Sequence, residues 1–400
     1  MLQFYGPGSC GPIGNECGAV FQLAPLAHQG GPWTETLIYE FKGKGGNDGE
    51  SPNGGLVIDS QGNLYGVTAY GGTGDCVLLG VPAGCGTVYE LSPPAEQGGE
   101  WTETILYSFP TAKQGYVPNG NLVFDSAGNL YGATVFGGGK GTTCDKFYQY
   151  CGAVFELSPP KTKGDKWTQK VLHAFANGTD GATPNGGLVL DTHGAIYGTT
   201  SLGGYHQGQC DRGEGFNGCG TVFRLNPPKQ KDGNWDETVL HRFKGPPSDG
   251  LGPAGGPALG AQGALYGGTV GGGTQEDGVV FELKPPTTKG GKWAESLLHT
   301  FTGGNDGQVA LAGLLVGPDG NLYGSAGGGT FHRGVIFRMS PSTNRVTWAF
   351  HVLYSFTGSP DGYDPLELTF GKGGAIFGAT LYGGTGQCQS GCGTVFQAQP

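Results

Sequence analysis

Charged side chains and long apolar runs are both scarce in this sequence. Aspartate, glutamate, lysine and arginine make up only 14% of the 400 residues, and 32 acidic residues outnumber 22 basic ones. The resulting net charge of −10 argues against a nucleic-acid partner, because such partners favour a basic face. The apolar runs are no longer than a strand, which excludes a transmembrane helix.

Targeting and catalytic signatures are absent as well. The opening, MLQFYGPGSC, has neither the basic nor the apolar stretch of a signal peptide, and the closing GTVFQAQP lies within a repeat. We therefore expect an N-terminally shortened form of a longer protein. No G-x-S-x-G, H-E-x-x-H or Walker pattern occurs, so we predict no catalytic residue and lean away from an enzyme.

Glycine, in contrast, is abundant, with 84 residues beside 26 prolines. A regular period accompanies this composition, which indicates many tight turns between short strands rather than disorder. All six tryptophans open a segment of the form W-x-x-x-φ-φ-[YH]-x-F, where φ is apolar and the pattern is typical of a strand. These tryptophans are Trp33, Trp101, Trp167, Trp235, Trp293 and Trp348.

The remaining strands of the repeat follow from two further motifs. GGLVIDSQGNLYGVT at 54–68 and its cognates read as a hairpin around a glycine-containing turn. CGTVYELSPP at 85–94 reads as a third strand that the Pro-Pro pair ends. The strand order is then a (GLVID), b (NLYGVT), c (GTVYEL) and d (WTETILYSF).

This pattern predicts an all-β fold, a β-propeller of four-stranded antiparallel blades in a single domain over 1–400. Repeats begin near 1, 54, 120, 186, 255, 312 and 366. Strand c occurs seven times and the others six times, so we predict seven blades with an incomplete first one. The alternative is six closed blades with one surplus strand.

Ten cysteines fall into five local pairs at one repeat position, the loop between strands b and c. Local disulfides in an oxidising compartment are the favoured interpretation, and metal binding by thiols is the alternative. The predicted pairs are Cys10–Cys17, Cys76–Cys85, Cys144–Cys151, Cys210–Cys219 and Cys388–Cys392.

The b–c and d–a loops emerge on the same side of an up-and-down meander, and this side is the candidate binding face. A recurring Asp-Gly lies in the d–a loops, where it forms tight turns or binds calcium or a sugar hydroxyl. Three asparagines precede strand a, where they form Asx turns or line a polar channel. Aromatic residues begin the b–c loops, where they stack on sugars or pack on neighbouring blades. The candidate residues are Asp48, Asp180, Asp249, Asp306, Asp361, Asn53, Asn119, Asn185, Tyr70, Phe136, Tyr205 and Tyr382.

The string D-x-x-G-N-L-Y-G-x-T, followed by G-[CG]-G-T-V-F-x-L, L-[HY]-x-F and D-G-x-x-P, resembles the GloVer-type tandem repeat of bacterial choice-of-anchor surface proteins. The resemblance covers essentially all 400 residues. It implies export and display at the cell surface. It carries over no catalytic residue, and this sequence departs from the pattern by lacking both a leader and an anchor.

We therefore predict an extracellular or cell-surface binding module, a monomer that recognises polysaccharide or a protein ligand through its loop face. We expect no metal or other cofactor, with calcium as the alternative. One further hypothesis is a glycan hydrolase or lyase with carboxylates from several blades, and a second is a structural adhesion protein. For the enzyme hypothesis, the divergent loops of the fifth and sixth repeats are the place to look, at Gln275, Glu276, Asp277, His332 and Arg333.

Overall fold

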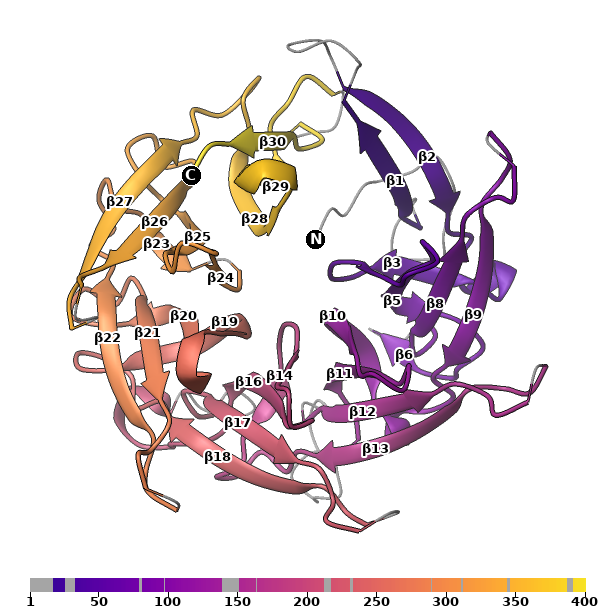
Figure 1. Cartoon of the computed structure of the whole chain (residues 1–400), viewed down its shortest axis with the longest axis horizontal. Helices are drawn as coiled ribbons and strands as arrows, with labels where there is room; N and C mark the ends of the chain where they lie inside the picture. Colours follow the sequence, from indigo (N-terminus) through magenta and orange to yellow (C-terminus); the bar gives the residue numbers. More distant parts are fainter. Residues whose placement is uncertain are drawn as a thin grey trace.

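The computed structural model shows a ring of antiparallel sheets around a central axis (Figure 1). It describes residues 17–400 except 26–32, 79–80, 97, 139–150, 163, 212–216, 231–232, 289, 311, 344–345 and 387–390. Seven sheets, numbered here 1 to 7 in chain order, form the ring. Helix in the described part is confined to short 3-10 turns: η1 (Lys44–Gly46), η2 (Ala112–Gln114), η3 (Gly208–Cys210), η4 (Ala261–Gly263) and η5 (Lys372–Gly374).

Sheets 2 to 6 are complete blades in which strands a, b, c and d pair in order from the axis outwards (Figure 1). Strand a is split in two in sheets 2, 4 and 6. Sheet 2 comprises β3 (Gly49–Pro52), β4 (Val57–Ile58), β5 (Leu64–Gly71), β8 (Thr87–Ser92) and β9 (Thr102–Ser108). Sheet 3 comprises β10 (Tyr116–Phe124), β11 (Leu130–Phe136), β12 (Ala153–Ser158) and β13 (Thr168–Ala174).

The next three sheets repeat this arrangement. Sheet 4 comprises β14 (Ala182–Pro184), β15 (Val189–Leu190), β16 (Ile196–Leu202), β17 (Thr221–Asn226) and β18 (Asp236–Arg242). Sheet 5 comprises β19 (Gly250–Leu259), β20 (Leu265–Gly272), β21 (Val279–Lys284) and β22 (Ala294–Thr300). Sheet 6 comprises β23 (Gln308–Ala310), β24 (Leu315–Val316), β25 (Leu322–Gly327), β26 (Val335–Pro341) and β27 (Trp348–Ser355). A small ribbon of β6 (Val77–Leu78) and β7 (Val81–Pro82) lies in the b–c loop of sheet 2.

The two terminal sheets are partial. Sheet 1 has strands c and d, β1 (Ala19–Ala24) and β2 (Thr34–Glu40), and sheet 7 has strands a to c, β28 (Tyr363–Phe370), β29 (Ile376–Tyr382) and β30 (Val395–Ala398). The predicted propeller of four-stranded antiparallel blades is thus confirmed. The predicted blade number differs slightly, because the described strands amount to six four-stranded blades and one additional strand c rather than seven blades. No ladder joins the described strands of sheets 1 and 7, so each terminal sheet keeps its own strands.

An aromatic core fills the space between consecutive sheets. The phenylalanine that follows each strand d packs edge-on against the aromatic residue of strand c in the next sheet, as Phe175 does against Phe223 at 5.1 Å between ring centroids. The same contact recurs between Phe243 and Phe281 at 5.1 Å. All four rings are fully buried. The repeat therefore places its largest apolar side chains between blades, where burial of each contributes roughly 2–3 kcal/mol.

The repeated tryptophans link each sheet to the preceding one. Trp235 packs on Tyr131 of the previous sheet at 5.9 Å between ring centroids, in an edge-to-face arrangement. The same geometry holds between Trp33 of sheet 1 and Phe377 of sheet 7, at 5.7 Å. Since Phe377 occupies the tyrosine position of its repeat, the ring closes by the contact that joins the other blades, without strand pairing.

Glycines line the axis, where the inner strands come together. Gly186 has a φ of +115°, and a Cβ atom there would lie 2.2 Å from the backbone of Gly255 in the next sheet. Only glycine allows both this backbone conformation and this approach. Among the described residues, no helix is long and apolar enough to span a membrane.

Candidate functional site

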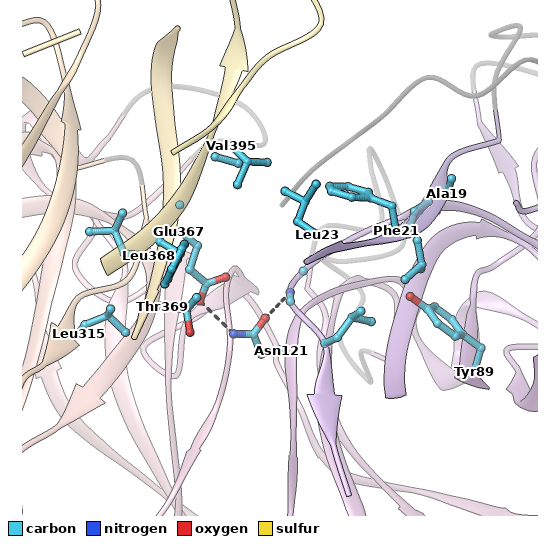
Figure 2. A pocket seen from close by; sticks show the side chains of 18 residues that line it. Ala19, Phe21, Leu23, Tyr89, Asn121, Leu315, Glu367, Leu368, Thr369 and Val395 are labelled. Carbon is cyan, nitrogen blue, oxygen red and sulfur yellow. Dashed lines mark hydrogen bonds between the residues drawn. The ribbon is translucent and has the colours of Figure 1, made fainter. Parts of the chain in front are cut away.

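A cleft opens from the axis between sheet 1 and sheet 7 (Figure 2). Its volume is about 510 Å³, and its walls are largely apolar, with Leu23 on one side and Leu368 and Val395 on the other. The polar centre lies at the axis. There Asn121 donates a hydrogen bond from Nδ2 to Glu367 Oε1 at 2.9 Å, and its Oδ1 accepts one from the Gly55 backbone N–H. One side chain of sheet 3 thus connects sheets 2 and 7.

The predicted asparagines lie on inner strands near the same axis. Asn119 donates from Nδ2 to Asn185 Oδ1 at 2.6 Å, which joins sheets 3 and 4. Asn53 donates from Nδ2 to the Pro118 carbonyl oxygen at 3.4 Å, which joins sheets 2 and 3. These side chains form polar links between neighbouring inner strands. A role in binding a ligand stays a prediction.

The aspartates of the Asp-Gly pairs connect each d–a loop to the strand d before it. Asp249 accepts hydrogen bonds from the backbone N–H groups of Lys244 at 2.9 Å and Gly250 at 2.6 Å, and its Oδ2 lies 3.2 Å from His241 Nε2. The other four make the same type of contacts with their own loop and with the ring of strand d: Asp48, Asp180, Asp306 and Asp361. The carboxylate oxygens are therefore already used within the loop, which supports turn formation.

The pKa of Asp180 agrees with a role of its carboxylate in forming the turn. Burial alone would raise the pKa of Asp180. The ring of His173 and the backbone N–H groups of Ala176 and Gly178 outweigh burial, so the pKa of Asp180 is lowered. An ionised carboxylate here accepts the hydrogen bonds of the loop.

A carboxylate from the next sheet joins this arrangement at several junctions. It belongs to the third residue of a W-x-E segment at the start of strand d, such as Glu295 in β22, whose Oε1 lies 3.4 Å from His241 Nε2. Burial, followed by the charge of Asp249, raises the pKa of Glu295. At the junction of sheets 1 and 2, burial and the charge of Asp48 raise the pKa of Glu103 to about 7. The chemistry of the His241, Asp249 and Glu295 group suits a metal ion, because its ligand atoms all lie within 4.8 Å of one another.

The predicted aromatic residues differ in their surroundings. Phe136 lies tilted on Tyr116 at 5.1 Å between ring centroids, and Tyr205 donates a hydrogen bond to Gln207 Oε1 at 3.1 Å. Tyr70 is partly buried against the core of sheets 2 and 3. Tyr382 is 37% exposed at the end of β29. The four residues thus share a repeat position but not an environment.

Tyr382 belongs to a stack that crosses two sheets. Its ring lies 5.0 Å from that of Tyr363, with 30° between the planes, and the guanidinium carbon of Arg333 lies 4.8 Å from the Tyr363 centroid. Arg333 is exposed, and its side chain makes no hydrogen bond with another described residue. Burial raises the pKa of the adjacent Asp364, and the charge of Arg333 opposes the rise. Cation, ring and exposed ring together form a platform at the candidate binding face.

Two of the predicted disulfides are confirmed in the b–c loops, Cys76–Cys85 and Cys210–Cys219. Cys17, Cys151 and Cys392 are also disulfide-bonded. Their predicted partners, Cys10, Cys144 and Cys388, lie outside the described residues. No described cysteine is free, so the thiol-metal alternative finds no support in this part of the chain.

The residues considered for glycan cleavage are not gathered around the cleft, whose lining does not include them. Glu276 accepts a hydrogen bond from Gln209 at 3.2 Å on the loop face. A carboxylate pair at the spacing of a glycosidase is therefore not assembled at the axis by these side chains.

A comparison with known protein families finds a match in the C-terminal part of the chain. Residues 208–400 match the Gloeobacter/Verrucomicrobia repeat. This C-terminal part of the chain is therefore similar to that repeat family. The Trp, Tyr-Gly and Cys-Gly positions that recur within the matched residues recur in the sheets before residue 208 as well.

Solved structures give a broader likeness. The repeat protein is similar to a putative glucose dehydrogenase of Thermus thermophilus, with 15% identity, a TM-score of 0.48 and 87% of this chain aligned to 97% of that one. It is also similar to a Trichoderma reesei protein of Carbohydrate-Active Enzymes Family AA12, with 13% identity, a TM-score of 0.47 and coverage of 94% and 97%. A putative gluconolactonase shares 15% identity, with a TM-score of 0.40 and coverage of 82% and 84%. No curated protein matches the sequence.

Several side chains of this site were not predicted from the repeat. Asn121 and Glu367 lie 246 positions apart, so no local pattern connects them. Arg333 was considered only for catalysis, yet it contacts Tyr363. Glu295 could have been found from the sequence, because the W-x-E segment recurs one repeat after an Asp-Gly.

Proposed function

We propose that this repeat protein is an extracellular module that binds polysaccharide through the loop face where strands b end and strands a begin. The observation that carries the proposal is the platform of Arg333, Tyr363 and Tyr382. An exposed tyrosine ring offers an apolar face to a sugar ring, and an adjacent guanidinium donates hydrogen bonds to hydroxyl or carboxylate oxygens. Oxidised cysteines in the b–c loops support an extracellular location.

The platform is held in place by regular structure rather than by flexible loops. Tyr363 and Tyr382 face one another in the ladder between β28 and β29. Arg333 sits two residues before β26, and its carbonyl oxygen accepts a hydrogen bond from the Asp364 N–H at 3.0 Å. Because the three side chains start from fixed backbone positions, binding of a sugar would cost little ordering entropy.

Calcium has no part in this proposal. The Asp-Gly aspartates, which were its expected ligands, accept hydrogen bonds from their own loops and from strand d. A calcium ion needs six to eight oxygen ligands, and these carboxylates are separated from one another by whole blades.

Affinity electrophoresis of the full chain against neutral and acidic soluble polysaccharides tests the proposal. We expect retardation by at least one polysaccharide, and roughly 3- to 10-fold weaker binding for Tyr382→Ala, as expected for the loss of one stacked ring. Phe136→Ala is the matched control, because Phe136 packs on Tyr116 as Tyr382 does on Tyr363 but is partly buried rather than exposed. Its binding should equal that of the unaltered protein.

Two results would overturn the proposal. One is the absence of binding to every polysaccharide tested, and the other is equal binding by Tyr382→Ala and the unaltered chain. Release of reducing sugar during incubation would instead support the hydrolase hypothesis. Concentration-dependent assembly without a ligand, measured by light scattering, would support the adhesion hypothesis.

A further inference from the structure

Three polar side chains from three elements converge between sheets 4 and 5. His241 lies in β18, Asp249 lies in the d–a loop before β19, and Glu295 lies in β22 of the next sheet. His241 Nε2 is 3.2 Å from Asp249 Oδ2 and 3.4 Å from Glu295 Oε1. The side chains are 16%, 5% and 18% exposed in that order. The group is therefore largely removed from water but still reachable from the loop face.

These spacings match those between the ligands of a small divalent metal ion. Zinc binds histidine nitrogen and carboxylate oxygen at about 2.0–2.2 Å in a tetrahedron, which places neighbouring ligand atoms roughly 3.3 Å apart. The two distances from His241 Nε2 bracket that value. An imidazole ligand and only two carboxylates favour a first-row transition metal over calcium or magnesium, which prefer oxygen and higher ligand numbers.

The charges and hydrogen bonds of the group point the same way. Glu295 Oε1 is buried and has no hydrogen-bond partner in the described structure. In a metal complex the two carboxylates would be deprotonated and would balance the two charges of the ion. Asp249 also accepts two backbone N–H groups, from Lys244 and Gly250. Such contacts behind a ligand hold it in the orientation that a metal requires.

Other junctions of the ring provide an internal comparison. Each junction has three cognate positions: the ring residue of strand d, the Asp-Gly position and the W-x-E position. Between sheets 1 and 2 these are Tyr39, Asp48 and Glu103, and between sheets 2 and 3 they are Tyr107, Gln114 and Gln169. Between sheets 5 and 6 they are His299, Asp306 and Phe350. None of these has all three ligand types. His173, Asp180 and Glu237 have them between sheets 3 and 4, but there the three ligand atoms do not all lie within 4.8 Å of one another. Within the described residues, only the His241 group meets the spacing of a metal site with a histidine.

We propose that His241, Asp249 and Glu295 form a binding site for one divalent transition metal ion of the zinc class, between sheets 4 and 5. The ion would connect strand d of sheet 4 and the loop that follows it to strand d of sheet 5. The site is separate from the aromatic platform. Its test therefore does not depend on the proposed polysaccharide binding.

Zinc itself is the probe for the full chain. The protein is treated with a chelator, dialysed and titrated with zinc in a competition assay against a chromophoric chelator. We expect one tight equivalent for the unaltered protein, absent in His241→Tyr and in Glu295→Gln. Loss of a direct ligand should cost more than the roughly 10- to 100-fold in affinity that loss of an outer partner costs. Cobalt should give a visible absorption band that both variants lack.

The repeat itself shows that these variants are compatible with the fold. Tyrosine occupies the His241 position in sheets 1, 2 and 6, and glutamine occupies the Glu295 position in sheet 3. His299→Tyr, at the junction with Phe350 in place of glutamate, is the control and should leave the zinc equivalent unchanged. The proposal is overturned if the unaltered protein binds no tight zinc, or if His241→Tyr and Glu295→Gln bind it as the unaltered protein does while circular dichroism shows all of them folded.

Discussion

Glu103 makes the stability of the ring depend on pH at the junction of sheets 1 and 2. Its side chain lies beside the linked pair Tyr39 and Asp48, whose hydroxyl and carboxylate are 2.9 Å apart, and its Oε1 is buried without a hydrogen-bond partner in the described structure. Burial, with a further contribution from the charge of Asp48, raises the pKa of Glu103 from 4.5 to about 7, and the charge of Lys42 opposes the rise.

The sign of the effect follows from proton binding. Between pH 4.5 and 7 the folded protein keeps a proton on Glu103 that the unfolded chain has lost. The stabilisation is thus fully present below about pH 4.5 and is lost as the pH rises through 7. A shift of this size corresponds to about 3 kcal/mol for a fully buried group. Because Glu103 is only half-buried, solvent screening reduces our expectation to about 1 kcal/mol.

Glu103→Gln copies the protonated side chain and should remove this dependence. The quantity to follow is the unfolding free energy of the variant minus that of the unaltered protein. We expect this difference to rise by about 1 kcal/mol from pH 4.5 to pH 8, measured by urea denaturation at pH 4.5, 6 and 8. Glutamine already occupies this position at Gln169 in sheet 3. Glu35→Gln, at the exposed cognate position of sheet 1, is the control and should give the same difference at every pH. A Glu103→Gln difference that does not change with pH would refute the reasoning.

Three further predictions concern stability. Gly186→Ala should lower the free energy of unfolding, measured in thermal melts, by more than the ~1–2 kcal/mol cost of the left-handed conformation, because the added methyl group meets the next inner strand. Gly45→Ala is the control and should not show this loss, because no atom lies within 4 Å of its new methyl group. Phe223→Ala should lower the free energy of unfolding in urea by about 3–5 kcal/mol, since its ring is fully buried between sheets. Replacing both Cys210 and Cys219 by serine should cost about 2–3 kcal/mol in the same assay, and an unchanged midpoint would contradict the role given to this disulfide.

The strands, hairpins and local disulfides could be predicted from the sequence, because each depends on residues close together in the chain. Alternating apolar residues, glycine turns and terminal prolines define strands and hairpins within a dozen residues, and the observed sheets follow those patterns. Cys76–Cys85 and Cys210–Cys219 close over nine positions, so sequence spacing alone made them the favoured pairs. Because the same strand pattern recurs in each repeat, the sequence indicated a propeller of repeated blades.

Long-range contacts depended on how the ring closes. Trp33 meets Phe377 because the first and last sheets come together, and repeat counting left open whether these sheets would pair as one blade. Asn121 of sheet 3 meets Glu367 of sheet 7 because the ring brings their inner strands together near the axis. The same repeat position also acquires different exposure in different blades. Tyr382 and its cognate Phe136 each pack on the tyrosine opposite in strand a, but Tyr382 is 37% exposed and Phe136 is partly buried.

The sequence by itself determined the strands, their order within a blade, the two disulfide pairs that the structure describes and the aromatic core positions, since each of these depends on neighbours one repeat away or less. Tertiary structure alone decided which polar groups converge. The group of His241, Asp249 and Glu295 exists because a turn, its preceding strand and the next blade bring their side chains to within hydrogen-bonding distance, which no single-strand periodicity encodes.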